Sequence, residues 1–154
     1  RLSDDGPLCG CGNKGCLESK IGLAAIAHRF LETPDLSGIE LTELPGHIVD
    51  LALQGDRKAI ETIDHFVHWL VQGLVSLVNL YNPSVVFLGG PVSRLAQAAI
   101  DRISEGVGRG IVTGIPAPAL MLSTLGPQEG AIGAAAIAHH HTFDISRLGL
   151  IMPR

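Results

Sequence analysis

Apolar residues recur at helical spacing along the first third of the chain. Between Leu17 and Leu31 they stand every three or four positions, and a Thr-Pro pair follows, so this segment predicts one continuous helix. The proline- and glycine-containing stretch 33–46 predicts mostly loop, and a short helix is expected over 47–53.

The longest apolar pattern runs from Arg57 to Asn82. Gly55-Asp56 before it is typical of a helix stop followed by an N-cap, and Pro83 ends it. Apolar residues alternate by three and four along one seam, and others lie off that seam. The pattern therefore predicts a long, buried central helix that is apolar on more than one side. The seam comprises Ile60, Ile63, Val67, Leu70, Leu74, Leu77 and Tyr81.

The remaining chain alternates between short apolar runs and helical patterns. Residues 85–88 are four consecutive apolar residues, which is typical of a central parallel strand buried on both faces. A helix over 92–106, a glycine-containing loop, a strand over 119–123 and a helix over 128–141 are expected to follow. The order strand, glycine turn, helix, strand, glycine turn, helix predicts an α/β unit with a parallel crossover connection.

Composition narrows the class of protein. The chain has 154 residues, enough for one domain or one lobe. It is rich in apolar residues, with 46% hydrophobic and 17% charged residues. We expect the apolar surplus to include a partner surface, as in a homodimer.

A net charge of −4 without a basic stripe argues against direct nucleic-acid contact from this segment. No signal peptide or run of 18 apolar residues occurs, so we expect no membrane contact and a cytoplasmic location.

All three cysteines stand within eight residues, at Cys9, Cys11 and Cys16. Glycines between them let the backbone turn tightly, and thiolates at this spacing can converge on one Zn²⁺. A structural zinc takes four ligands, so a His or Cys is expected from elsewhere. His28 is not expected to reach the loop, because twelve residues of helix span about 18 Å. The alternatives are a disulfide of Cys16 with one of the other two, leaving a spare thiol, or three free surface thiols.

Two glycine turns follow the predicted strands, where ligands of open α/β sheets bind. Backbone amides at Gly89-Gly90 and around Gly130 can approach a nucleotide there, although close packing also explains both turns. Glu18 follows the cysteines and either favours the start of its helix or hydrogen-bonds a polar ligand. No nucleophile accompanies the polar residues of the long helix, which are Asp64, His65 and His68.

These elements in this order resemble the ROK family, which joins sugar-responsive repressors and sugar kinases. The anchor is the segment 5–18, DGPLCGCGNKGCLE, which is similar to the family's zinc loop with its trailing acidic residue. Supporting matches lie at 55–56, 79–90 and 130–136. The resemblance covers nearly the whole chain. It implies the C-terminal lobe of a ribonuclease H-like (actin-like ATPase) fold, helix-rich with a short parallel sheet.

The resemblance also implies how the chain is organised. Residues 1–154 form the C-terminal lobe, and the N-terminal lobe and any helix-turn-helix are expected outside this chain. In the family the fourth zinc ligand is a histidine shortly before the first cysteine, which places it just upstream of Arg1. The parts of the lobe are a zinc loop (5–18), a helical region (17–82), a βαβα unit (84–141) and a tail (142–154).

Ligand-binding residues carry over only in part. Glu18 maps onto the family's sugar contacts, and Gly89, Gly90 and Gly130 map onto its nucleotide-contacting regions. The catalytic aspartate, the amino-terminal phosphate motif and the other sugar contacts have no counterpart here. We therefore expect no catalytic residue, and no kinase activity in the isolated chain.

Two features favour the regulator branch of the family. Pro91 stands where the family's kinases usually carry a third glycine, and the chain continues beyond the last helix to Arg154. We expect the sugar-sensing and dimerisation part of a transcriptional regulator that binds a sugar or sugar phosphate. The alternative is half of an ATP- and Mg-dependent sugar kinase of the hexokinase or glucokinase type, and a third is a zinc-binding interaction module.

Overall fold

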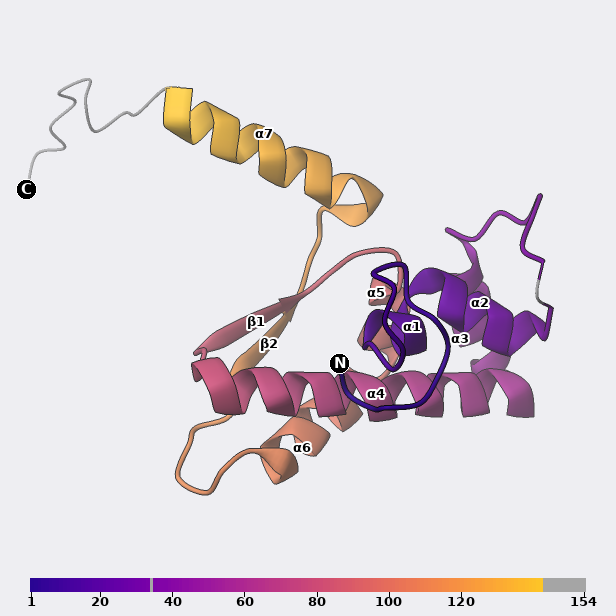
Figure 1. Cartoon of the computed structure of the whole chain (residues 1–154), viewed down its shortest axis with the longest axis horizontal. Helices are drawn as coiled ribbons and strands as arrows, with labels where there is room; N and C mark the ends of the chain where they lie inside the picture. Colours follow the sequence, from indigo (N-terminus) through magenta and orange to yellow (C-terminus); the bar gives the residue numbers. More distant parts are fainter. Residues whose placement is uncertain (34, 143–154) are drawn as a thin grey trace, which may run out of the picture.

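The computed structural model describes residues 1–33 and 35–142, and most of them are helical (Figure 1). Of the predicted tail, residues 143–154 lie outside this part of the chain. The elements in chain order are α1 (Glu18–Ile21), α2 (Leu23–Leu31), α3 (Leu44–Leu53), α4 (Arg57–Tyr81), β1 (Val85–Leu88), α5 (Ser93–Ala98), α6 (Ile100–Gly110), β2 (Ala119–Leu122), the 3-10 turn η1 (Gly126–Gln128) and α7 (Glu129–Thr142).

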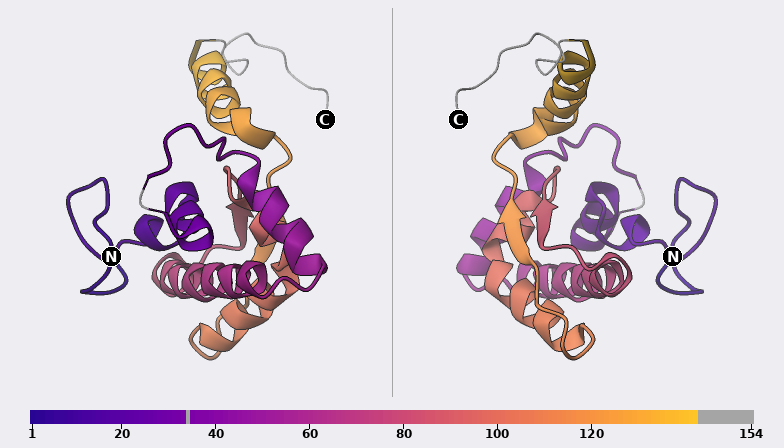
Figure 2. Two further views of the ribbon diagram at one scale, coloured as in Figure 1. Left: turned by 90° about the vertical axis from the view of Figure 1, so that its right-hand side faces the viewer. Right: turned by 90° about the vertical axis from the view of Figure 1, so that its left-hand side faces the viewer.

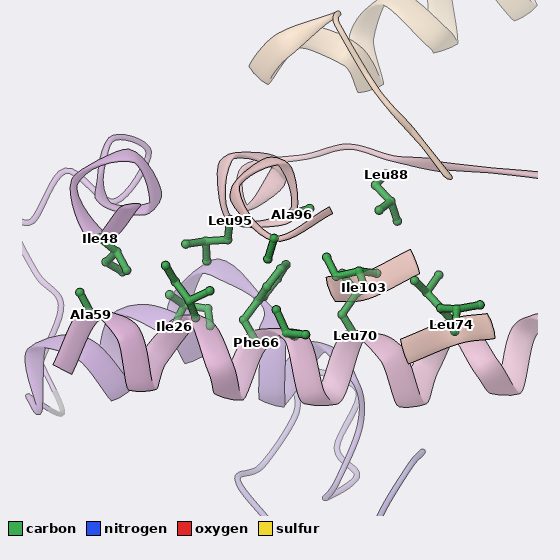
Figure 3. Close-up of a cluster of buried hydrophobic side chains, with 14 of the residues drawn as sticks. Ile26, Ile48, Ala59, Phe66, Leu70, Leu74, Leu88, Leu95, Ala96 and Ile103 are labelled. Carbon is green, nitrogen blue, oxygen red and sulfur yellow. The ribbon is translucent and has the colours of Figure 1, made fainter. Parts of the chain in front are cut away.

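The long helix α4 is the axis around which the other helices pack. It begins as predicted, because the carboxylate of Asp56 accepts a hydrogen bond from the Ala59 amide at 2.7 Å. It ends at Tyr81, and the next residue, the C-cap Asn82, has a left-handed φ of 46° and precedes a proline. Figure 3 shows its buried side chains meeting those of α2, α3, α5, α6 and β1. The predicted central position of this helix is confirmed.

The predicted helix over 17–31 is wrong in one respect, because it is two helices separated at Gly22. The Gly22 amide is the last donor of α1, and its carbonyl is the first acceptor of α2. Between these bonds the backbone is extended, with ψ at 159°. The chain therefore bends at Gly22, and both short helices pack against α4.

The next helix, α3, begins three residues earlier than predicted. It starts at Leu44 instead of His47, with Pro45 in its first turn. A proline is tolerated there because the first amides of a helix have no partner within it. Leu44 and Pro45 are both buried, so packing against the core extends the helix into what sequence suggested was loop.

The predicted strands β1 and β2 are confirmed as a parallel pair, with Val85 opposite Ala119 and Leu88 opposite Leu122. The expectation that β1 is buried on both faces is wrong for this chain. Val86 and Leu88 point into the core, but Phe87 is 68% exposed. Within the described residues, helices cover one face of this sheet only.

The predicted helix over 92–106 is also divided, at Ala99, into α5 and α6. Helix α6 continues to Gly110, through glycines that were expected to form a loop. A Cβ at Gly106 would stand 2.9 Å from Val71, and one at Gly110 would stand 2.5 Å from Val75. The lack of a side chain at these two glycines therefore lets α6 lie close against α4.

Helix α7 stands apart from the rest of the molecule (Figures 1 and 2). It follows the Gly126-Pro127 turn as predicted, and its apolar side chains are largely exposed, including Ile132 at 42% and Ile137 at 63%. Over the ranges that the structure describes, none of the helices has the length and apolar character needed to cross a bilayer.

Candidate functional site

The cysteine loop is a tight hairpin that is closed by hydrogen bonds within its own backbone. Leu8 and Lys14 form an antiparallel bridge, the Cys9 amide donates to the Asn13 carbonyl at 2.8 Å, and the Gly12 amide donates to the Cys9 carbonyl at 2.9 Å. These bonds close the turn that carries the first two cysteines. Cys16 follows as the chain leaves the hairpin and enters α1.

The loop brings the three sulfur atoms together, as the spacing predicted. The Sγ atoms of Cys9, Cys11 and Cys16 all lie within 4.8 Å of one another, and those of Cys11 and Cys16 are 3.5 Å apart. Four ligands at about 2.3 Å around a tetrahedral zinc place neighbouring sulfurs about 3.8 Å apart. The three thiols are free and fit one face of such a site.

The surroundings of the thiols also suit a metal. Hydrogen bonds from the Asn13 backbone amide and side chain, and then from Cys16, lower the pKa of Cys11 to about 7. The hydrogen bond with Cys11, together with burial, raises the pKa of Cys16 to about 11. These hydrogen bonds therefore favour the thiolate form of Cys11 and the protonated form of Cys16. A bound cation would ionise both, because metal ligation requires the thiolate.

A cavity of about 920 Å³ adjoins the loop. Buried Cys9 forms part of its wall, and Glu18, the first residue of α1, places a carboxylate on it. The other charged residues and the histidines on the wall come from α1, from α2 and its C-cap, and from α4, and they are Lys20, His28, Arg29, Glu32 and His65. Acidic and basic groups therefore face one space, which suits a ligand with many hydroxyl groups.

Two histidines belong to this wall although sequence reasoning set them aside. The chain bends at Gly22, and His28 lines the same cavity as Cys9, so the distance estimated along one straight helix does not apply. The His28 ring contacts the Thr33 carbonyl at 2.7 Å, and His28 is not among the groups that converge with the sulfurs. It is therefore a wall residue, not a fourth ligand in this structure.

His65 is the clearest omission from the sequence-based site. It lies on α4, 3.3 Å from the Lys20 carbonyl, and its ring is in a T-shaped arrangement with that of Trp69. Burial, and then the positive charge of Arg29, lowers its pKa below the ordinary 6.5. The sequence offered one signal for His65, which is that it is a polar residue within a mostly apolar helix. That signal does not show which neighbouring element its side chain faces. Asp64 beside it pairs instead with Arg102 at 2.7 Å.

The two glycine turns meet at one edge of the sheet. Gly90 has a φ of 84° as the chain leaves β1, and its carbonyl accepts from the Ser93 amide at 3.1 Å. The start of α7 reaches the same place through Glu129, whose carboxylate lies over Gly89. A Cβ added at Gly130 would meet no atom within 4 Å, so this glycine is not required by close packing.

Comparison with known proteins gives consistent matches. A sequence model of the ROK family matches residues 1–141. A glucokinase from Thermotoga maritima is 31% identical over 147 residues, covering 88% of this chain and 46% of the glucokinase. A xylose repressor from Bacillus spizizenii is 26% identical over 145 residues, covering 94% of this chain and 36% of the repressor.

A solved structure agrees with these sequence matches. The crystal structure of a ROK family glucokinase from Streptomyces griseus, in complex with glucose and AMPPNP, matches with a TM-score of 0.71 at 30% identity. The match covers 89% of this chain and 48% of that one. The chain thus spans half or less of the length of these relatives.

Proposed function

Because the chain belongs to the ROK family, we propose that it is the sugar-sensing and dimerisation part of a ROK transcriptional regulator with a structural zinc loop. Its fold class is the predicted one, the C-terminal lobe of an actin-like ATPase fold. Relatives include both glucokinases and xylose repressors, so membership is compatible with either activity. The observation that carries the proposal is the cavity shared by the cysteine loop and Glu18, with charged side chains on its wall.

The zinc part of the proposal rests on the sulfur geometry. Cys9, Cys11 and Cys16 are the three proposed ligands, and the fourth is a histidine just upstream of Arg1. The Leu2 amide donates to the Gly15 carbonyl at 2.9 Å, so the first residues run beside the loop. A residue immediately before Arg1 stands at most two chain steps from Leu2, within about 8 Å of it. That position is compatible with the fourth corner of the site.

The ligand part of the proposal rests on the cavity. Its volume of about 920 Å³ is ample for a sugar, and the Glu18 carboxylate can accept hydrogen bonds from sugar hydroxyls. Lys20 and Arg29 on the same wall can hold the phosphate of a sugar phosphate. Because the zinc loop leads directly into α1, the metal would fix the position from which Glu18 reaches the ligand.

The regulator is favoured over the kinase by the turn after β1. Pro91 follows Gly90 and has no amide to donate to a phosphate, and its ring stiffens the turn. In the alternative, a kinase, Gly89, Gly90 and Gly130 would contact ATP and Mg²⁺ would accompany it. The proposal further includes a homodimer, a cytoplasmic location and no direct nucleic-acid contact from this segment.

The test uses the complete polypeptide that carries this chain. Binding of a panel of monosaccharides and their phosphates is measured by calorimetry, and phosphorylation with MgATP is measured in parallel. We expect binding of one sugar or sugar phosphate without its phosphorylation, and loss of that binding in Glu18→Gln. Glu105→Gln, an equal change on α6 away from the cavity, is the control. Catalytic phosphorylation of the bound sugar would establish the kinase instead.

A further inference from the structure

We propose that Glu129 is a specificity-determining residue that keeps nucleoside triphosphates out of the glycine turn after β1. The inference rests on the proposed function, because it concerns how a sugar sensor on this fold differs from an enzyme that uses ATP. It comes from one contact between two segments that are forty residues apart in the sequence.

The two strand ends and the start of α7 converge at this point. The Ser123 amide, directly after β2, donates to the Leu88 carbonyl at the end of β1, at 2.8 Å. From Ser123 the chain passes through η1, and Glu129 is the first residue of α7. The carboxyl edge of a parallel sheet, with a glycine turn beside it, is where open α/β sheets take up ligands. Any ligand that uses this edge therefore meets Glu129.

The Glu129 carboxylate fills the space that the glycines open. A Cβ at Gly89 would stand 2.8 Å from the carboxyl carbon of Glu129, and one at Gly90 would stand 3.8 Å from its Oε1 atom. The carboxylate thus lies directly against the bare backbone of Gly89. A phosphate that approached this backbone would have to displace it.

The charge of Glu129 also opposes the binding of a phosphate, as the volume of its side chain does. In the part of the chain that the structure describes, the ion pairs formed by Lys and Arg do not include Glu129. Its negative charge is therefore not balanced by a cationic partner there, and it repels a phosphate a few ångström away. Uncharged adenosine is not repelled, so charge selects against triphosphate more than against nucleoside. Discrimination by such a repulsive element is a common route to specificity.

The experiment compares binding of MgATP and of adenosine to the complete polypeptide by calorimetry. The variants are Glu129→Ala, which removes volume and charge, and Glu129→Gln, which removes charge alone. Glu105→Ala changes the charge equally on α6, which lies at the far end of the molecule from α7 (Figures 1 and 2). Circular dichroism and sugar binding establish that each variant is folded.

We expect both Glu129 variants to bind MgATP at least about tenfold more tightly than wild type, with a smaller change for adenosine. Glu105→Ala should bind like wild type. Unchanged MgATP affinity in both Glu129 variants, with sugar binding intact, would overturn the inference and leave the proposed function standing. Tight MgATP binding by wild type would also overturn it. Sugar phosphorylation by wild type would in addition overturn the proposed function.

Discussion

Among single residues, the cysteines of the loop have unequal surroundings. Cys9 is buried, Cys16 is half-buried and Cys11 is exposed. Exposure makes Cys11 the thiol whose replacement disturbs the core least. A loss of function on its replacement would therefore report on the metal and not on packing.

We predict that Cys11→Ala in the complete polypeptide loses most of its zinc and, with it, the response to sugar. The loop would no longer fix the start of α1, and Glu18 would move with it. Metal analysis and sugar calorimetry on the same preparation are the measurements. Lys14→Ala, an exposed change in the same loop, is the control. Normal sugar affinity in a zinc-free Cys11→Ala protein would contradict this coupling.

His65 gives a prediction about pH. Its pKa is lowered in the folded chain, so below the ordinary 6.5 the unfolded chain takes up a proton that the folded chain resists. The free energy of unfolding should therefore fall as the pH drops from 7 towards 5. Solvent reaches the ring, so the slope should stay well below the one-proton limit of about 1.4 kcal/mol per pH unit.

The test of this pH effect is urea unfolding at several pH values. His65→Gln should lose less stability than wild type between pH 7 and 5, because the titrating group is gone. His47→Gln, a change of an exposed histidine on α3, is the matched variant. Identical pH dependence in wild type and His65→Gln would show that other groups dominate.

Among the elements, the break between α1 and α2 has the largest consequence for the site. Gly22 ends one helix and begins the next, and a Cβ there would stand 2.6 Å from the Glu18 carbonyl oxygen. This backbone oxygen has little freedom to move, because it accepts the Gly22 amide at 2.8 Å. The bend also carries His28 and Arg29 to the cavity.

We predict that Gly22→Ala lowers the free energy of unfolding by about 1–3 kcal/mol and weakens sugar binding. Gly108→Ala on α6 is the matched control, because a Cβ there meets no atom within 4 Å. It should be neutral or stabilising by up to about 1 kcal/mol, since alanine is the better helix former. Urea unfolding compares the two variants. Equal stability of Gly22→Ala and wild type would mean that the bend tolerates a side chain.

In the whole molecule, one group of exposed large apolar side chains belongs to elements that follow one another in the chain. They lie at the carboxyl end of α4 and on the uncovered face of the sheet. The middle of α4 is covered by the neighbouring helices, so this exposed apolar surface does not extend along the whole helix. The residues are Leu77, Leu80, Tyr81, Val85, Phe87 and Met121.

We predict that the 154-residue chain self-associates at micromolar concentration through this surface, and light scattering measures its mass against the 16.2 kDa of one chain. Leu80→Ser should weaken association, because Leu80 is 72% exposed at the end of α4. Leu53→Ser, at 82% exposed on α3, should not. A monomer of wild type throughout this range would contradict the prediction.

Features governed by neighbours in the sequence were predicted well. The start of α4 follows from Asp56 as a cap, both strands follow from continuous apolar runs, and the cysteine cluster follows from a spacing of a few residues. Each depends on contacts within about one turn of the chain. The sequence by itself therefore determined the order of the strands and of the main helical segments, and the composition of the candidate metal loop.

Only the tertiary structure decided what lies beside that loop and beside the glycine turn. The bend at Gly22 depends on packing against α4, and the place of His65 at the cavity depends on which face of α4 meets α1. Glu129 reaches Gly89 because β1 and β2 end at the same edge of the sheet. These contacts join residues far apart in the chain, so their chemistry is set by packing between elements, which local patterns do not encode.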